Sequence, residues 1–242
     1  MKYKIQKLRS GLIGVMLLLF VMTTVAPKLS QAQDLLKFEK RMTEFTLDNG
    51  MKFLVLDRHE APVVSFHTYA DVGAVDEVKG ITGIAHLFEH MAFKGTKTVG
   101  TTDYESEAKA FALADQAFEA MKIERRKGDK ADEVKLEELQ KQFAEAQEEA
   151  QKYLVHDEFE EALVREGGAG FNAYTSQDAT QYTVSLPSNK IELWMSLESD
   201  RFGNPVLREF YKEKNVVMEE RRLSTESQPV GRLLEEFLAI AY

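Results

Sequence analysis

The chain contains no cysteine among its 242 residues. That absence excludes a disulfide-stapled fold, a thiolate metal site, a cysteine nucleophile and a lipid-modified cysteine anchor. Proline and glycine are also few, at 5 and 14 residues, so a collagen-like chain is excluded. With 44% apolar and 29% charged residues, the composition is that of a globular protein with one or two domains.

Basic residues are scarce outside the N-terminus. Residues 1–32 carry five basic residues and no acidic one, so the remainder has 26 basic against 40 acidic residues, a net charge of −14. Nucleic-acid-binding domains need basic patches on their surface. We therefore expect no nucleic-acid partner.

Residues 1–32 have the three parts of a secretory signal peptide. A basic segment (2–9) precedes an apolar run (11–25), and Ser30-Gln31-Ala32 provides small residues for cleavage before Gln33. An uncleaved membrane anchor is the alternative, but the apolar run is shorter than the ~20 residues that span a bilayer comfortably. We expect a secreted protein, in the bacterial periplasm, with no stable membrane anchor after signal cleavage.

The predicted elements of residues 33–242 indicate an α+β domain with a mainly antiparallel sheet covered by helices. Asn49-Gly50 between two apolar runs is the strongest signal of a β-hairpin. Two capping boxes, Thr102 with Glu105 and Asn189 with Glu192, predict helix starts. The other expected elements are strands at 63–69 and 180–186 and helices at 82–93, 207–226 and from Pro229 onward.

Residues 102–166 repeat apolar side chains at heptad spacing on both sides of a turn-like break at 127–130. We therefore predict an antiparallel helical hairpin over about 102–166. Its many charges favour a solvated surface, and a docking surface for a partner remains the alternative.

The string His86-Leu87-Phe88-Glu89-His90 carries the clearest chemistry. On a helix, His86 and His90 lie one turn apart on the same face, where two imidazoles can bind one metal ion. Zinc suits two imidazoles and a carboxylate, with a fourth position left open. Glu89 lies on nearly the same face and can take a proton from a water that zinc has made acidic. The alternative is a helix with two surface or core histidines.

The wider context of this string is GITGIAHLFEHMAFKGT, residues 80–96. It resembles G-x-A-H-x-x-E-H-M-x-F-x-G-T, the motif of the inverted-motif zinc metallopeptidases of family M16, which include pitrilysin, insulinase and the mitochondrial processing peptidase. Residues 47–50 and 171–182 are similar to two further segments of that family. The resemblance implies that His86 and His90 bind one zinc ion and that Glu89 is the catalytic base.

The third zinc ligand of the family is a glutamate in a segment E-[KR]-x-x-V-x-x-E. This chain reads EKNVVMEE from Glu213 to Glu220. The resemblance implies that Glu220 is the ligand and that Glu213 supports the metal site and catalysis. Glu219 is the rival ligand, but it is turned about 100° from Glu220 on a helix, whereas Glu213 and Glu220 share a face.

Asn172 and Ala173 match the family segment that borders the substrate cleft. There an edge strand pairs with the substrate backbone, a form of β-augmentation. Without the resemblance, Asn172 reads as a turn residue after a glycine-rich loop.

The resemblance implies a zinc metalloendopeptidase that hydrolyses peptides or unfolded protein segments. Compared with the family, residues 102–166 are then an insertion. Family members work as paired domains, so we expect a second domain or subunit to complete the cleft, and a natural chain that continues beyond Tyr242. The alternative is a non-catalytic partner or structural subunit, although such members usually lose part of the motif.

Overall fold

A computed structural model describes residues 39–78 and 80–241, and these form two compact units. One unit ends at Ala61 and the other begins at Pro62. The predicted signal peptide, residues 1–32, lies outside the described residues. Within the described ranges, no helix is both long and apolar enough to cross a membrane.

The first unit contains the predicted β-hairpin. Strand β1 (Met42–Thr46) pairs antiparallel with β2 (Lys52–Leu56), and the turn between them contains Gly50 at φ +88°. A positive φ is favourable for glycine and costly for most other residues, which explains why Asn-Gly predicts this turn. Phe45 and Phe53, directly opposite each other in the register, stack at 5.0 Å.

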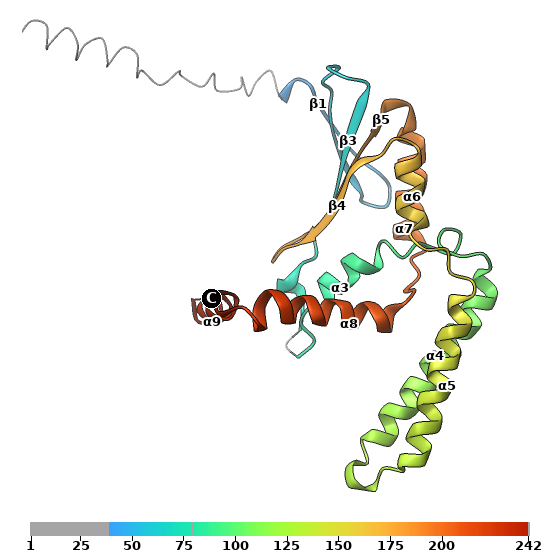
Figure 1. Cartoon of the computed structure of the whole chain (residues 1–242). Coiled ribbons are helices and arrows are strands. Elements are labelled where there is room, and N and C mark those ends of the chain that lie inside the picture. Colours follow the sequence, from blue (N-terminus) through green and yellow to red (C-terminus); the bar gives the residue numbers. More distant parts are fainter. Residues whose placement is uncertain (1–38, 79, 242) are drawn as a thin grey trace, which may run out of the picture. The chain divides into compact units, whose positions relative to one another are not determined.

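The second unit is built on a three-stranded antiparallel sheet of order β3-β5-β4, formed by β3 (Val63–Ala70), β4 (Ala169–Thr175) and β5 (Thr180–Pro187). Helices α6 (Glu158–Arg165) and α7 (Ile191–Gly203) lie beside the sheet in Figure 1. The core contains Phe159, Leu163, Val184 and Leu186, with Phe66, Trp194 and Leu197 packed against them. The structure thus confirms the predicted α+β class.

Two helices that are distant in the sequence meet next to this sheet. Helix α3 (Ile84–Met91) contacts β4, β5 and helix α8 (Phe210–Arg221). After α8 a π-helical turn (Arg222–Glu226) leads into α9 (Pro229–Ala241), whose apolar side chains are exposed. The α3–α8 contact brings together the two segments with predicted metal ligands.

Helices α4 (Tyr104–Arg125) and α5 (Glu133–Gln151) form the predicted antiparallel hairpin, as Figure 1 shows. Alanines and a methionine are buried where the two helices meet, namely Ala114, Met121, Ala146 and Ala150, and Phe118 packs against Phe143. The hairpin is shorter than the predicted range 102–166, because α6 packs in the core of the sheet instead of extending α5.

Both predicted capping boxes are wrong in detail. Helix α4 is capped by Asp103, which accepts a hydrogen bond from the Ser106 N–H, while the Thr102 N–H and hydroxyl are bound to the carbonyl of Tyr153. Asn189 lies inside a 3₁₀ turn (Ser188–Lys190) that delays the start of α7 to Ile191. At Thr102 a tertiary contact takes the hydroxyl that the capping pattern would have used, and at Asn189 a 3₁₀ turn replaces the first turn of the helix.

A single buried arginine connects the hairpin to the rest of the unit. The guanidinium of Arg208 donates to the Glu107 carboxylate at 2.7 Å and to the carbonyls of Lys94, Thr96 and Val99 at 2.5–3.0 Å. Arg208 and Glu107 are each 1% exposed. Losing one partner of such a pair leaves a buried charge uncompensated, which is costly. The pair therefore fixes the N-terminal end of α4 to the loop 94–99.

At the tip of the hairpin, Glu124 in the last turn of α4 contacts the connecting turn and the start of α5. Although its side chain is buried, its carboxylate accepts hydrogen bonds from the Lys127 ammonium at 2.8 Å and from the Asp132 N–H at 3.1 Å. An ion pair with Lys135 adds to these. Hydrogen bonds from Lys127 and Asp132 lower the pKa of Glu124 to about 2.

We predict that acid loosens the tip of the hairpin through Glu124. Its folded-state pKa lies below its ordinary value of 4.5, so its stabilising effect is complete above about pH 4.5 and is lost as the pH falls toward about 2. The protection factor of the Asp132 N–H, which compares its intrinsic with its observed exchange rate, should fall across this range in the wild type. Glu124→Gln should show fast exchange with little pH dependence beyond intrinsic chemistry.

The matched control is Glu137→Gln, on the exposed surface of α5. It should leave the wild-type pH dependence at Asp132 intact. An Asp132 exchange profile that is the same in Glu124→Gln and the wild type would contradict the assignment.

Candidate metal centre

Three nitrogen and oxygen atoms from α3 and α8 face one another. His86 Nε2 lies 3.3 Å from His90 Nε2, and Glu220 Oε2 lies 3.5 Å and 3.7 Å from these two nitrogens. We call this set the donor triangle. It is the one group of three or more metal-ligating side chains found among residues 39–78 and 80–241.

The size of the donor triangle fits a zinc ion. Zinc binds imidazole nitrogen and carboxylate oxygen at about 2.0–2.2 Å, and a tetrahedral arrangement then separates neighbouring ligand atoms by about 3.3–3.5 Å. The three observed separations are close to this range. His86 and Glu220 are about 40% and 47% exposed, which leaves one side of the triangle open for a fourth ligand.

The helix that carries both histidines begins with an unusual cap. Gly83, at the start of α3, has φ +92°, which glycine adopts without strain. The Glu77 carboxylate accepts the N–H groups of Gly83 and Ala85, each at 2.8 Å. It therefore satisfies free donors at the N-terminus and complements the helix dipole there. Glu77 thus fixes the first turn of the helix that positions His86.

Glu213 and Glu220 are seven residues apart on α8, about two helical turns, and both carboxylates face α3, as the helical periodicity predicts. Glu220 completes the donor triangle, and Glu213 Oε2 lies 3.2 Å from His90 Nδ1. The rival Glu219 makes a two-point ion pair with Arg222 at 2.5 and 2.8 Å. Glu219 is therefore engaged on another face of α8.

Glu213 is buried and connects His90 to a lysine. A carboxylate on the Nδ1 side of an imidazole fixes the ring and leaves Nε2 free for a metal. The Lys94 ammonium lies 2.6 Å from Glu213 and 3.2 Å from Glu209. Burial disfavours the charge on Lys94, but hydrogen bonds and charges from Glu213 and Glu209 outweigh it and raise the pKa of Lys94. Lys94 is thus a cation that holds Glu213 against His90.

Glu89 lies on α3 between the two histidines and is 8% exposed. The hydroxyl of Thr175, on β4, donates to Glu89 Oε2 at 2.6 Å. Burial raises the pKa of the nearby Tyr182 to about 12, and the charge of Glu89 adds to this effect. Tyr182 therefore stays neutral near pH 7. The hydrogen bond from Thr175 fixes the orientation of the Glu89 carboxylate.

The two residues predicted to bind substrate lie on strand β4. Asn172 and Ala173 pair with Thr183 and Tyr182 of β5, and β4 forms one edge of the described three-stranded sheet. No described strand pairs with its outer side. The strand also contacts α3, the helix that carries both histidines of the donor triangle.

The sequence analysis missed four residues that shape this region. They are Glu77, Lys94, Thr175 and Arg208. Lys94 and Thr175 stand inside the segments that carry the family resemblance, so their positions were visible but their roles were not. Each role depends on partners at least six residues away in the sequence, and for three of the four residues the partner is more than eighty residues away.

Comparison with known proteins agrees with the motif. A family model described as "Insulinase (Peptidase family M16)" matches residues 52–123 and 146–242. The unmatched residues between these ranges contain the tip of the helical hairpin.

Individual relatives are longer than this chain. It is 26% identical over 200 residues to "Zinc protease PqqE" of Helicobacter pylori, covering 81% of this chain and 32% of that protein. A crystal structure of a protease from Helicobacter pylori matches with a TM-score of 0.53 and 26% identity, over 79% of this chain and 33% of that one. An uncharacterized zinc protease of Rickettsia bellii is 46% identical over 52 residues, which is 22% of this chain and 13% of that protein. The chain therefore spans about a third of the length of the Helicobacter relatives.

We predict that Glu77→Gln destabilises the second unit by about 1 kcal/mol, because an amide oxygen accepts fewer hydrogen bonds and carries no charge for the helix dipole. Urea unfolding, followed by circular dichroism, measures the change. Glu192→Gln is the matched control, since Glu192 lies in the first turn of α7 and no side-chain cap is present there. Equal stability of the two variants would show that Glu77 does not anchor α3.

Proposed function

Because the chain belongs to the insulinase family of peptidases, family M16, we propose that it is the zinc-binding, catalytic domain of a metalloendopeptidase. The observation that carries this proposal is the donor triangle, where two imidazole nitrogens and one carboxylate oxygen meet at zinc-like separations. The names of the relatives, which are zinc proteases, support the choice of metal.

We propose that His86, His90 and Glu220 bind one zinc ion per chain. Bound zinc would supply Lewis acidity that polarises a peptide carbonyl and lowers the pKa of water. Glu213, with Lys94 behind it, would hold the His90 ring so that Nε2 points at the metal. This support explains why a second buried glutamate stands next to the ligands.

Glu89 is the proposed general base. Its carboxylate would take a proton from the attacking water and return it to the leaving amine, so one group serves both proton transfers. The hydrogen bond from Thr175 occupies Oε2 and leaves Oε1 for the water.

The substrate would be an extended peptide or an unfolded segment. The outer edge of β4, with Asn172 and Ala173, is unpaired among the described residues and can add one strand of substrate by main-chain hydrogen bonds. Such pairing selects an extended backbone and reads little side-chain sequence. We propose that these two residues hold the substrate next to the donor triangle.

We also propose that a second domain or subunit completes the cleft. The chain spans only about a third of its Helicobacter relatives, and exposed apolar side chains on α9 offer surface for such a partner. The predicted signal peptide supports a location outside the cytoplasm, in the bacterial periplasm. A non-catalytic subunit is the alternative, and no metal ligand or base is missing that would favour it.

We predict that Glu220→Gln lowers zinc affinity by at least about 100-fold, because loss of a ligand should cost no less than loss of an outer-shell partner. Titration against a competing chelator measures the affinity. Glu219→Gln removes the same charge from the neighbouring position and should bind zinc like the wild type. The reverse pattern would assign the ligand to Glu219.

We predict that Glu89→Gln keeps one zinc per chain and lowers peptide hydrolysis by about 10²–10⁴-fold. The assay uses a mixed library of quenched fluorescent peptides, with a chelator as a second control. Undiminished hydrolysis by Glu89→Gln would contradict the mechanism. A wild-type chain that binds zinc but cleaves nothing would show that the second half of the cleft is needed.

A further inference from the structure

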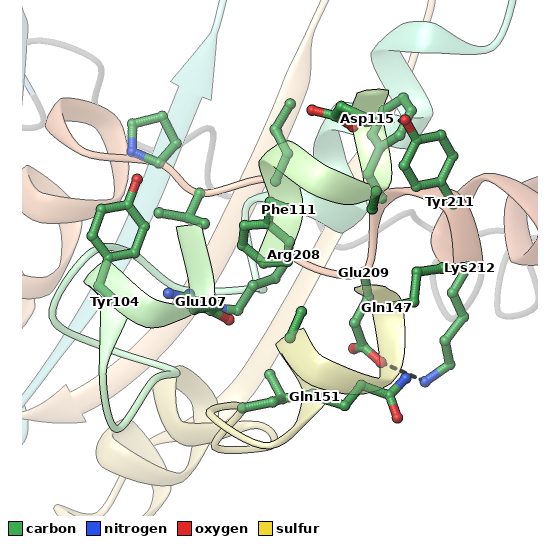
Figure 2. A pocket seen from close by; sticks show the side chains of 17 residues that line it. Tyr104, Glu107, Phe111, Asp115, Gln147, Gln151, Arg208, Glu209, Tyr211 and Lys212 are labelled. Atoms are coloured by element: carbon green, nitrogen blue, oxygen red, sulfur yellow. Dashed lines mark hydrogen bonds and ion pairs between the residues drawn. The ribbon is translucent and has the colours of Figure 1, made fainter. Parts of the chain in front are cut away.

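A groove lies between the helical hairpin and the helix that carries Glu220. It has a volume of about 550 Å³ and is lined by residues of α5, α8 and the π-helical turn after α8. We call it the α5–α8 groove. Three of its lining residues, Gln147, Tyr211 and Lys212, also line a separate cavity at the base of the hairpin (Figure 2). The other lining residues on α8 and the turn continue along the helix as far as Leu223.

The groove is continuous with the proposed zinc site. Glu220 lines the groove, and its side chain is 47% exposed although its carboxylate also faces His86 and His90. A zinc ion held by Glu220 would lie about 2.0–2.2 Å from a carboxylate oxygen. A peptide with its scissile carbonyl at that ion therefore has neighbouring residues within reach of the groove.

The groove presents apolar side chains to solvent. Val216 and Leu223 are 37% and 56% exposed, and most of the exposed lining is apolar. Removing such surface from water is favourable, in rough proportion to the apolar area that is covered. The groove therefore favours an apolar occupant.

The wall that the hairpin contributes is held in place by aromatic packing. The Phe143 ring lies 4.9 Å from the Tyr211 ring and 5.7 Å from the Phe118 ring, measured between centroids. The Tyr211 hydroxyl is fixed in turn by a hydrogen bond to Asp115 at 2.7 Å. Phe143 falls within residues 124–145, which the family model leaves unmatched. This wall is therefore an addition to the part of the chain that the family model describes.

The charged residues of the groove already have partners. The Lys212 ammonium pairs with Glu209, and the Glu219 carboxylate pairs with Arg222. Glu220 would be neutralised by the zinc ion that it binds. None of these groups calls for a charged ligand, so the lining favours a neutral side chain.

Spacing along α8 sets how far the groove extends from the metal. Leu223 and Val216 are three and four residues from Glu220, about one helical turn on either side, and Tyr211 is nine residues away, roughly 13 Å along the axis. An extended peptide advances about 3.3 Å per residue. The groove therefore matches substrate side chains about two to four residues from the scissile bond.

We propose that the α5–α8 groove is a substrate subsite that receives one large apolar side chain, such as phenylalanine, about two to four residues from the scissile bond. Phe143, Val216 and Leu223 form its apolar surface. The helical hairpin then supplies a side-chain preference that main-chain pairing with β4 does not provide. This inference rests on the proposed peptidase function, because it starts from a peptide placed at the zinc ion.

The test uses polyalanine peptides with a hydroxamate at one end, because a hydroxamate binds zinc and fixes the register. A single phenylalanine replaces alanine at successive positions, in one series with a C-terminal and in another with an N-terminal hydroxamate. Fluorescence anisotropy of a label at the far end measures binding to the zinc-loaded chain, and no cleavage is needed. In one series, phenylalanine two to four residues from the hydroxamate should bind about tenfold more tightly than alanine, through partial burial of its ring.

Two variants connect this preference to the groove. Leu223→Ala and Phe143→Ala should each lower the advantage of phenylalanine by about threefold or more, because each removes apolar surface. Both should leave binding of the all-alanine hydroxamate unchanged, since neither residue belongs to the donor triangle. Leu113→Ala is the matched control. Leu113 is 58% exposed on α4 and does not line the groove, so this variant should bind like the wild type.

Phe143→Ala also loosens the aromatic packing, so Leu223→Ala tests the groove independently. The proposal is overturned if no position in either series favours phenylalanine, which is the result expected if a second domain covers the groove. It is also overturned if the preference survives Leu223→Ala, or if Leu113→Ala lowers it equally. A chain that binds neither zinc nor the all-alanine hydroxamate would overturn the proposed function as well. Tight hydroxamate binding without a phenylalanine preference would overturn the subsite alone.

Discussion

The contact between α3 and α8 is the constraint on which the proposed chemistry depends. Helix α8 brings Glu213 and Glu220 to one face, next to His86 and His90. Carboxylates that are gathered in this way repel one another unless cations offset them. Lys94 supplies one such charge from the loop directly after α3, and a bound zinc ion would supply the other.

The same region explains how a long helical hairpin fits into this domain. Arg208 precedes α8 and fixes the loop after α3 through three carbonyls, while Glu107 of the hairpin neutralises it. The hairpin is thus attached at its root to the segment that positions the metal-binding helices. Its far end depends on its own contacts around Glu124. None of these contacts involves a residue of the donor triangle.

Periodicity was enough to predict much of this arrangement. His86 and His90 are four residues apart, and Glu213 and Glu220 are seven apart, so each pair shares a helix face. The structure places ligand atoms of His86, His90 and Glu220 within 3.7 Å of one another. The Asn-Gly hairpin and the helical hairpin also follow from local patterns. The capping box at Thr102 failed because Thr102 is bound to Tyr153, 51 residues away, and the one at Asn189 failed because Asn189 lies inside a 3₁₀ turn.

The roles of Lys94 and Thr175 could not be predicted for the same physical reason. Their partners lie 119 and 86 residues away in the sequence, so only the folded chain defines them. The cavity at the base of the helical hairpin is a further case, since α4, α5 and residues 205–212 all contribute to its lining (Figure 2). Sequence patterns thus predict which groups face one way along an element, and tertiary packing decides what they meet.

The most direct test of the account is anomalous X-ray diffraction at the zinc absorption edge, from crystals of the zinc-loaded chain. The account predicts one strong peak per chain, bonded to His86 Nε2, His90 Nε2 and the Glu220 carboxylate, with Glu213 on His90 Nδ1. A peak ligated by other side chains, with no zinc between the two histidines, would contradict it.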